Sequence, residues 1–139
     1  MKSLIFASAN AHKAHEIQQI LEGTFEIKTM RDIGFDGEIE ETEPTLEGNA
    51  RLKARFLHEK FGVDCFSDDS GLEVYALDLE PGVLSARYAG EAKNAAANMD
   101  KLLEKMAGKT DRRARFRAVI CLIINDLEVL FEGICEQTA

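Results

Sequence analysis

Two neighbouring carboxylates, Asp68 and Asp69, stand between two short apolar runs, in the segment 67–71 that reads Ser-Asp-Asp-Ser-Gly. Successive side chains of an extended backbone point to opposite sides, so we expect these two carboxylates to have different roles. One of them can hold a metal ion or accept a proton from a water nucleophile. An Asx turn between two strands, with Gly71 allowing a sharp bend, explains the same residues equally well.

A second group joins an acidic loop to a helix. Glu40 and Glu41 lie in the acid-rich stretch 32–44, and the following helix carries Asn49 and Lys53 on one face. Carboxylates facing an amide and an ammonium group suit a hard divalent cation beside a phosphate. From these residues alone, a solvated acidic loop before a polar helix face is the favoured interpretation.

Candidate phosphate contacts lie in two further segments. Ser8, Asn10 and Lys13 follow an apolar strand at the start of a helix, where backbone amides can receive an anion. The competing interpretation is a helix cap followed by a solvated lysine. In the segment 81–90, Ser85 and Arg87 could both reach a phosphate, although a surface arginine paired with an acid is the more usual case.

Hydrophobic spacing predicts the elements that position these residues. Each helix is expected to bury an apolar stripe: Ile17, Ile20 and Leu21 in the first, Met99, Leu102, Leu103 and Met106 in the third. Asn125-Asp126 is predicted to be the tight turn of a hairpin. The predicted strands are 4–7, 25–28, 65–66, 72–75, 113–124 and 127–135, and the predicted helices are 11–21, 45–61 and 94–106. This alternation indicates an α/β class with a mixed sheet.

Composition narrows the class of protein. The 139 residues include 17 Lys and Arg against 25 Asp and Glu, which gives a formal net charge of −8. An acidic chain of this length favours one globular domain and argues against binding nucleic acid polymers or membranes. The three cysteines, Cys65, Cys121 and Cys135, form no metal or disulfide pattern, so we expect reduced, mostly buried thiols in a cytoplasmic protein.

Taken together and in order, these segments resemble the inosine triphosphate pyrophosphatase family. The segments that match are SANAHK, ETEPTLEGNARLKAR, SDDSGLEV, PGVLSARYAG, NMDKLLEKM and ARFRAVICLI. The resemblance implies an α/β fold with a mixed twisted sheet and flanking helices, two lobes around a central cleft, and a long antiparallel hairpin at the end. It also implies a homodimer that hydrolyses ITP, dITP and XTP to the monophosphate and pyrophosphate with Mg²⁺.

The resemblance also implies a role for individual residues. Asp69 would be the general base and a metal ligand together with Glu41. The residues that would bind the triphosphate substrate are Ser8, Asn10, Lys13, Lys53 and Ser70. The supporting residues would be Asp68, Asn49 and Arg87.

The chain departs from the family pattern in two places and at its end. Glu43-Pro44 replaces a glycine-containing stretch, and Gln137 stands where the family has glycine. The family's later Gly-Phe-Gly-Tyr-Asp-Pro and Ser-His-Arg segments, which hold the purine base, are absent from these 139 residues. We therefore expect residues 1–139 to be a single pyrophosphatase domain that is C-terminally incomplete relative to the family. The alternative function is a non-catalytic, dimerising or metal- and phosphate-binding remnant without a base pocket.

Overall fold

The computed structural model describes residues 2–138, without the side chains of residues 137 and 138. The expected difference from the family at Gln137 therefore lies outside the described side chains. The chain forms two compact units, and three of its strands contribute residues to both. Unit 1 consists of Met1–Glu43, Glu47–Asp68 and Ile120–Phe131, and unit 2 consists of Pro44–Leu46, Asp69–Val119 and Glu132–Ala139.

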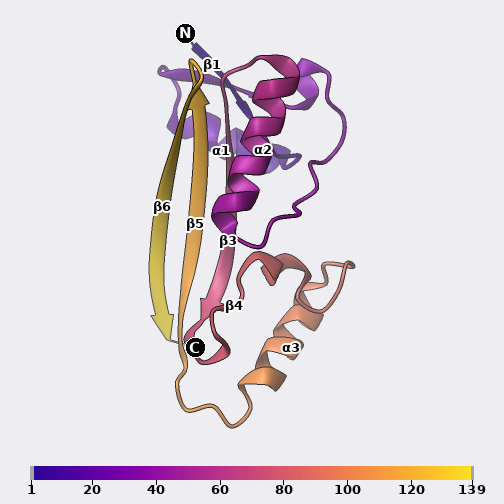
Figure 1. Ribbon diagram of the computed structural model, residues 1–139, viewed down its shortest axis with the longest axis vertical. Coiled ribbons are helices and arrows are strands. Elements are labelled where there is room, and N and C mark those ends of the chain that lie inside the picture. Colours follow the sequence, from indigo (N-terminus) through magenta and orange to yellow (C-terminus); the bar gives the residue numbers. More distant parts are fainter. Residues whose placement is uncertain (1, 139) are drawn as a thin grey trace. The chain divides into compact units, whose positions relative to one another are not determined.

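Unit 1 contains the strands β1 and β2 and the helices α1 and α2 (Figure 1). Strand β1 pairs in parallel with β2 along its whole length and with β3 at Ile5 and Phe6. A short 3₁₀ helix, η1, follows β2 in the predicted irregular stretch. The bounds are β1 Lys2–Phe6, α1 Ala11–Ile20, β2 Phe25–Thr29, η1 Arg31–Ile33 and α2 Leu46–Phe61.

The two helices of unit 1 cover opposite faces of its sheet. Helix α1 contributes Ala14 to a core cluster with Leu4, Phe6 and Phe66. The neighbouring side chain of Ser67 instead donates a hydrogen bond to a backbone carbonyl of α2. Because adjacent residues of a strand face opposite ways, α1 and α2 must lie on opposite sides of it. This arrangement places the start of α1 and the middle of α2 at the same strand.

Strand β3, Cys65–Val74, runs without interruption through the two carboxylates. The predicted strands 65–66 and 72–75 therefore belong to one strand, and the alternative of an Asx turn between them is wrong. Cys65 and Phe66 are paired with β1, and Glu73 and Val74 are paired with β4, so both ends of the segment are fixed in a sheet. Strand pairing at both ends overrides the turn preference of the Asp-Asp-Ser-Gly sequence between them.

Unit 2 is built around the second half of β3. Its core cluster consists of Val74, Met106 and Ala114, with Leu72 and Leu102 packed against it. Asn94 is the N-cap of helix α3, Ala95–Met106, because its side-chain oxygen accepts a hydrogen bond from the Ala97 backbone nitrogen at 3.0 Å. The elements between β3 and the hairpin are η2 Tyr75–Leu77, β4 Glu80–Pro81, η3 Gly82–Arg87 and α3 Ala95–Met106.

Gly71 has a different role from the predicted sharp bend. It lies inside β3, and an added Cβ atom would stand 2.2 Å from the backbone oxygen of Gly82. Glycine at this position therefore allows two backbone segments to approach closely. Ser85 holds the same contact, because its hydroxyl donates to the Gly82 oxygen and accepts from the Leu72 backbone nitrogen.

Two of the predicted buried stripes are only partly correct. Ile20 in α1 is 80% exposed, and in α3 Met99 and Leu103 are 53% and 54% exposed. Periodicity identifies the apolar face of a helix but not how much of that face another element covers. In α2, by contrast, Ala50, Ala54 and Leu57 are fully buried.

The chain ends in the predicted hairpin of β5, Arg113–Ile124, and β6, Leu127–Thr138. Asn125 and Asp126 both have positive φ angles, which is the conformation of the tight turn predicted from their residue types. Next to this turn, Asp126 accepts from His58 Nε2 at 2.7 Å, and His58 Nδ1 lies 2.9 Å from the Val63 oxygen. The end of α2 is thereby fastened to the hairpin within unit 1.

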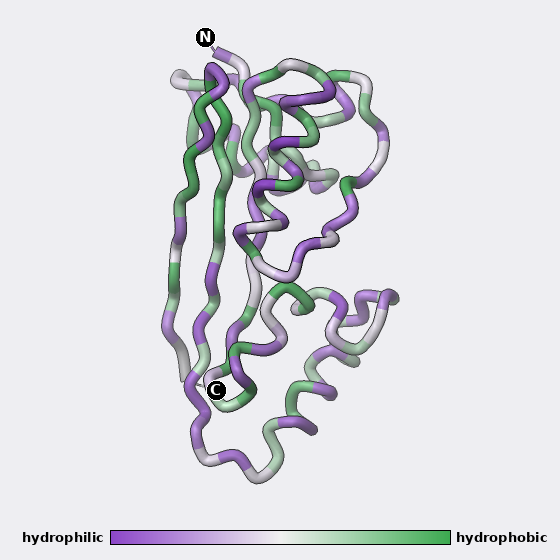
Figure 2. The backbone as a smooth tube through the Cα atoms, viewed as in Figure 1, coloured by the Kyte–Doolittle hydropathy of each residue, from purple (hydrophilic) through white to green (hydrophobic). Residues whose placement is uncertain are grey.

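The hairpin leaves apolar side chains uncovered. Along β6, Leu127 is 67% exposed and Phe131 is 52% exposed, with Val129 on the same face between them. Glu128, on the other face, binds Arg55 of α2. Figure 2 shows hydrophobic colouring along both strands near the turn. We refer to Leu127, Val129 and Phe131 as the exposed hairpin face.

The strands follow the order β2-β1-β3-β5-β6, with β4 beside β3, and the sheet contains both parallel and antiparallel pairs. The predicted α/β class with a mixed sheet, flanking helices and a terminal hairpin is confirmed. The central cleft between two lobes stays a prediction. None of the described helices is long and apolar enough to cross a membrane.

Candidate active site

The turn from β1 into α1 is held by its own polar side chains. Asn10 is the N-cap of α1 and accepts from the Lys13 backbone nitrogen at 3.0 Å, while Ser8 Oγ accepts from the Asn10 backbone nitrogen at 3.1 Å. The interpretation of Asn10 as a helix cap is thus correct. The solvated-lysine interpretation of Lys13 is wrong, because its ammonium group forms an ion pair with Asp68.

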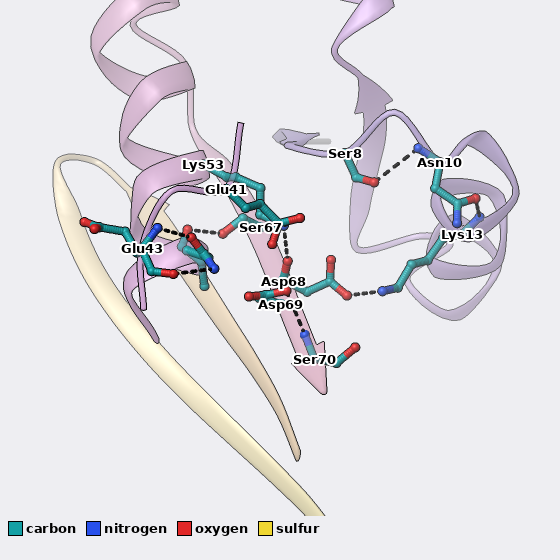
Figure 3. A network of polar contacts seen from close by, with 12 residues as sticks. Ser8, Asn10, Lys13, Glu41, Glu43, Lys53, Ser67, Asp68, Asp69 and Ser70 are labelled. Atoms are coloured by element: carbon teal, nitrogen blue, oxygen red, sulfur yellow. Dashed lines mark hydrogen bonds and ion pairs between the residues drawn. The ribbon is translucent and has the colours of Figure 1, made fainter. Parts of the chain in front are cut away.

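Asp68 is the point at which two helices meet the strand. Its carboxylate binds the ammonium group of Lys13 from α1, and its backbone oxygen accepts from Lys53 Nζ of α2 at 2.5 Å. The close view in Figure 3 shows both lysines directed at this residue from different sides. Two positive charges from separate helices therefore stand at one position of β3.

The acidic loop 32–44 is linked to Asp68 through Lys53, which also contacts Glu41. Its Nζ atom lies 3.8 Å from Glu41 Oε1, and only 9% of the lysine is exposed. Asn49, fully buried one helical turn earlier, accepts from the Glu43 backbone nitrogen at 2.9 Å and donates to the Glu43 oxygen at 3.2 Å. These two bonds hold the loop against α2, so the predicted group of Glu41, Asn49 and Lys53 is brought together.

Asp69 points away from Asp68, as expected for the next residue of a strand (Figure 3). Its Oδ1 atom accepts from the Ser70 backbone nitrogen at 3.1 Å, and both residues are partly buried in unit 2. The surroundings of the two carboxylates differ, while their different roles stay a prediction. Asp68 is bound by a lysine, whereas Asp69 accepts from the backbone of its neighbour.

The segment 81–90 contributes less than its residue types suggested. The hydroxyl of Ser85 is used by Gly82 and Leu72, so it supports the backbone of unit 2. Arg87 ends η3 and is partly buried in the same unit. Its role toward a phosphate stays a prediction.

The side chains of the site have the right chemistry for Mg²⁺. No group of three His, Cys, Asp or Glu side chains that could hold a metal ion occurs among residues 2–138. Mg²⁺, however, is commonly bound by one or two carboxylates and completed by substrate phosphates and water. Glu41 and Asp69 each offer a hard oxygen ligand of this kind, so the chemistry of each residue fits Mg²⁺.

The cysteines have no part in this chemistry. Burial raises the pKa of the Cys65 thiol to about 12 and that of the Cys121 thiol to about 11, which keeps both protonated at neutral pH. Cys135 is exposed, so the expectation of mostly buried thiols holds for two of the three.

The sequence interpretation missed Ser67. This residue is fully buried, and its hydroxyl donates to the backbone oxygen of Ala50 in α2. A usable signal was present, because Cys65 and Ser67 alternate with the apolar Phe66 and therefore share the other face of the strand. This alternation was not used, because the residue types at 67–71 leave a turn open as an alternative.

Comparisons with known proteins show which family this chain is similar to. The sequence pattern of the Ham1 family matches residues 4–138. The dITP/XTP pyrophosphatase of Flavobacterium psychrophilum is 52% identical over 133 residues, which cover 96% of this chain and 70% of that protein. The protein of the same name from Porphyromonas gingivalis is 53% identical over 139 residues, which cover 99% of this chain and 72% of that one.

Solved structures agree as well. The Ham1 protein of Staphylococcus aureus superposes with a TM-score of 0.92 at 38% identity, covering 99% of this chain and 71% of that one. A HAM1 protein from Coxiella burnetii gives a TM-score of 0.92 at 34% identity, covering 99% of this chain and 73% of its own.

Proposed function

The chain belongs to the Ham1 family, and we propose that it hydrolyses dITP, ITP and XTP to the nucleoside monophosphate and pyrophosphate. Relatives about half identical to it carry the name dITP/XTP pyrophosphatase, which supports the reaction and the substrate class. The observation in this chain that carries the proposal is the meeting of Lys13 and Lys53 at Asp68. Two ammonium groups from separate helices suit a substrate whose reacting part is a polyanion.

Substrate binding would exchange partners within this group. Lys13 would move its ammonium group from the Asp68 carboxylate to a phosphate oxygen, and Lys53 would bind a second phosphate oxygen. Ser8 and Asn10 lie at the N-terminus of α1, where the positive end of the helix dipole favours an anion. These four residues, all in unit 1, would bind the triphosphate.

In the same proposal, unit 2 supplies the groups nearest the chemistry. Asp69 would accept the proton of the attacking water while the water oxygen bonds to one of the two phosphorus atoms joined by the α–β bridging oxygen. The bond from that phosphorus to the bridging oxygen would break, which gives the monophosphate and pyrophosphate. Ser70 would contact the substrate, and Arg87 would support phosphate binding. Asp68 would act by holding Lys13 before the substrate arrives.

Mg²⁺ is the metal ion that we propose, with Glu41 and Asp69 as its carboxylate ligands. When bound, the ion would neutralise phosphate charge and lower the pKa of a bound water. Glu41 is held close to Lys53 and its loop is fastened by Asn49, which supports a fixed position for this carboxylate.

The assembly and location are proposed separately. The exposed hairpin face supports a homodimer, because uncovered apolar residues beside an edge strand favour association. A cytoplasmic location matches the site of nucleoside triphosphate metabolism. We treat residues 1–139 as one pyrophosphatase domain, which spans about 70% of the length of the F. psychrophilum relative.

Pyrophosphate release tests the proposed function. The parent chain should release pyrophosphate from XTP, dITP and ITP in the presence of Mg²⁺ and much less from GTP. The variant Asp69→Asn should lose about 10²- to 10⁴-fold in turnover while keeping its fold and its affinity for nucleotide, because the amide keeps the shape of the side chain but cannot accept the proton. The matched variant Asp68→Asn should lose less turnover and more stability.

Two results would contradict this assignment. Equal turnover in Asp69→Asn and the parent would remove Asp69 from the mechanism. Triphosphate binding without pyrophosphate release in the parent would favour the alternative of a non-catalytic binding protein, for which the comparisons give no support.

A further inference from the structure

Two neighbouring side chains on one face of β3 are bonded to two carbonyls of α2. Cys65 Sγ donates to the backbone oxygen of Ala54 at 3.2 Å, and Ser67 Oγ donates to that of Ala50. Alternate side chains of a strand are about 6.6–6.8 Å apart, and carbonyls four residues apart on a helix are separated by about 6 Å. The two spacings match, so these bonds define one register of the strand on the helix.

The bond made by Ser67 is the one next to the candidate site. Asp68 is the following residue, and its backbone oxygen is bonded to Lys53, which lies between Ala50 and Ala54 on the helix. A sliding or tilting of β3 on α2 would separate these two groups. It would also change the position of Lys53 relative to Glu41, which is 3.8 Å away.

We propose that Ser67 is a positioning residue whose hydroxyl fixes β3 on α2 and so aligns Lys53 with Asp68. This inference rests on the proposed function for its consequence in catalysis, but its structural part stands on contacts within unit 1. The hydroxyl touches neither substrate nor reacting atoms, and it acts through Lys53.

Three single variants separate positioning from the filling of a buried space. Ser67→Ala removes the donor, and Ser67→Cys restores a sulfur donor of the kind that Cys65 already provides to the same helix. Cys65→Ala removes the other bond and is the matched control. Cys65 lies two residues further than Ser67 from Asp68, the residue that is bonded to Lys53. We expect Ser67→Ala to lower kcat for XTP about tenfold, a size that one hydrogen bond can account for. Its KM for XTP should rise as well, because a displaced Lys53 contacts the triphosphate less well.

In the same assay, Ser67→Cys should recover most of the lost kcat, and Cys65→Ala should stay within about twofold of the parent. Each kcat is expressed per folded molecule, using the folded fraction from urea unfolding. A kcat for Ser67→Ala within twofold of the parent would overturn the inference, as would equal losses in Ser67→Ala and Cys65→Ala.

A double-mutant cycle with Lys53→Met decides whether Ser67 acts through Lys53. If it does, adding Ser67→Ala to Lys53→Met should lower kcat much less than it does in the parent. The same cycle can be measured with the equilibrium constant of unfolding in urea, which requires no enzymatic activity. There we expect the effects of the two substitutions to depart from additivity by at least threefold. If the parent releases no pyrophosphate, the proposed function fails, and the unfolding cycle alone judges the positioning role. Additive unfolding constants would overturn it.

Discussion

Replacing Gly71 by alanine should weaken unit 2 by an amount that follows from one contact. The added Cβ atom would lie 2.2 Å from the Gly82 oxygen, whereas side-chain Cβ atoms do not come closer than 3.0 Å to such a neighbour. The backbone must therefore open by 3.0 − 2.2 = 0.8 Å, and no side-chain rotation can relieve a contact with a carbonyl. Overpacking of this kind costs about 1–3 kcal/mol.

The same movement disturbs two hydrogen bonds. Ser85 Oγ donates to the displaced Gly82 oxygen at 2.7 Å and accepts from the Leu72 nitrogen at 2.9 Å. Each bond contributes about 1 kcal/mol net. We expect Gly71→Ala to lower the free energy of unfolding by about 2–4 kcal/mol in total.

Urea unfolding followed by circular dichroism measures this loss. Gly133→Ala is the matched control, because Gly133 also lies in a strand and an added Cβ atom there meets nothing within 4 Å. The control should change the free energy of unfolding by less than about 1 kcal/mol. Equal stability of Gly71→Ala and Gly133→Ala would refute the argument from the close approach.

The other predictions concern charge, metal, pH and association. Lys53→Ala should weaken triphosphate binding about 10- to 100-fold in calorimetric titrations, because one charge-assisted bond is lost; unchanged affinity would exclude a phosphate contact. Glu41→Gln should raise the Mg²⁺ concentration needed for half-maximal turnover more than it raises KM for nucleotide; an unchanged Mg²⁺ dependence would exclude it as a ligand. The hydrogen bond to the Val63 carbonyl, and to a smaller extent that to the Asp126 carboxylate, raises the pKa of His58. The bonds of His58 therefore stabilise the fold fully at a pH below the unfolded pKa of about 6.5, and this stabilisation is lost as the pH rises through the folded pKa. Urea unfolding should therefore show a larger deficit for His58→Gln at pH 6 than at pH 9, and a constant deficit would contradict this. Sedimentation should show concentration-dependent association of the parent that Phe131→Lys reduces, whereas a clean monomer at high concentration would count against the exposed hairpin face.

Local patterns in the sequence determined most of the elements. The bounds of β5 were predicted without error, and the Asn125-Asp126 turn followed from residue types that tolerate positive φ angles. Helix α2 followed from a period of 3.6 residues, and Asn10 caps α1 as its residue type favours. These features depend on contacts between near neighbours in the chain, which is why the sequence alone is sufficient to predict them.

The order of the motifs also indicated the family and the candidate residues, although not how those residues meet. Lys13 and Asp68 are 55 positions apart, and their ion pair forms because α1 packs on the face of β3 to which Asp68 points. Tertiary structure alone decided that pairing. It also decided that Ile20 remains exposed, since none of the described elements covers that part of its helix face.

The segment 67–71 shows the physical reason most clearly. Its Asp, Ser and Gly residues have the local preferences of a turn, but pairing with β1 before it and β4 after it keeps it extended. Gly71 is required because the Gly82 carbonyl, eleven residues later, approaches its backbone. Ser67 is buried because α2 presents the Ala50 carbonyl to it. Neither partner can be identified from local sequence, because both are brought there by the packing of elements distant in the chain.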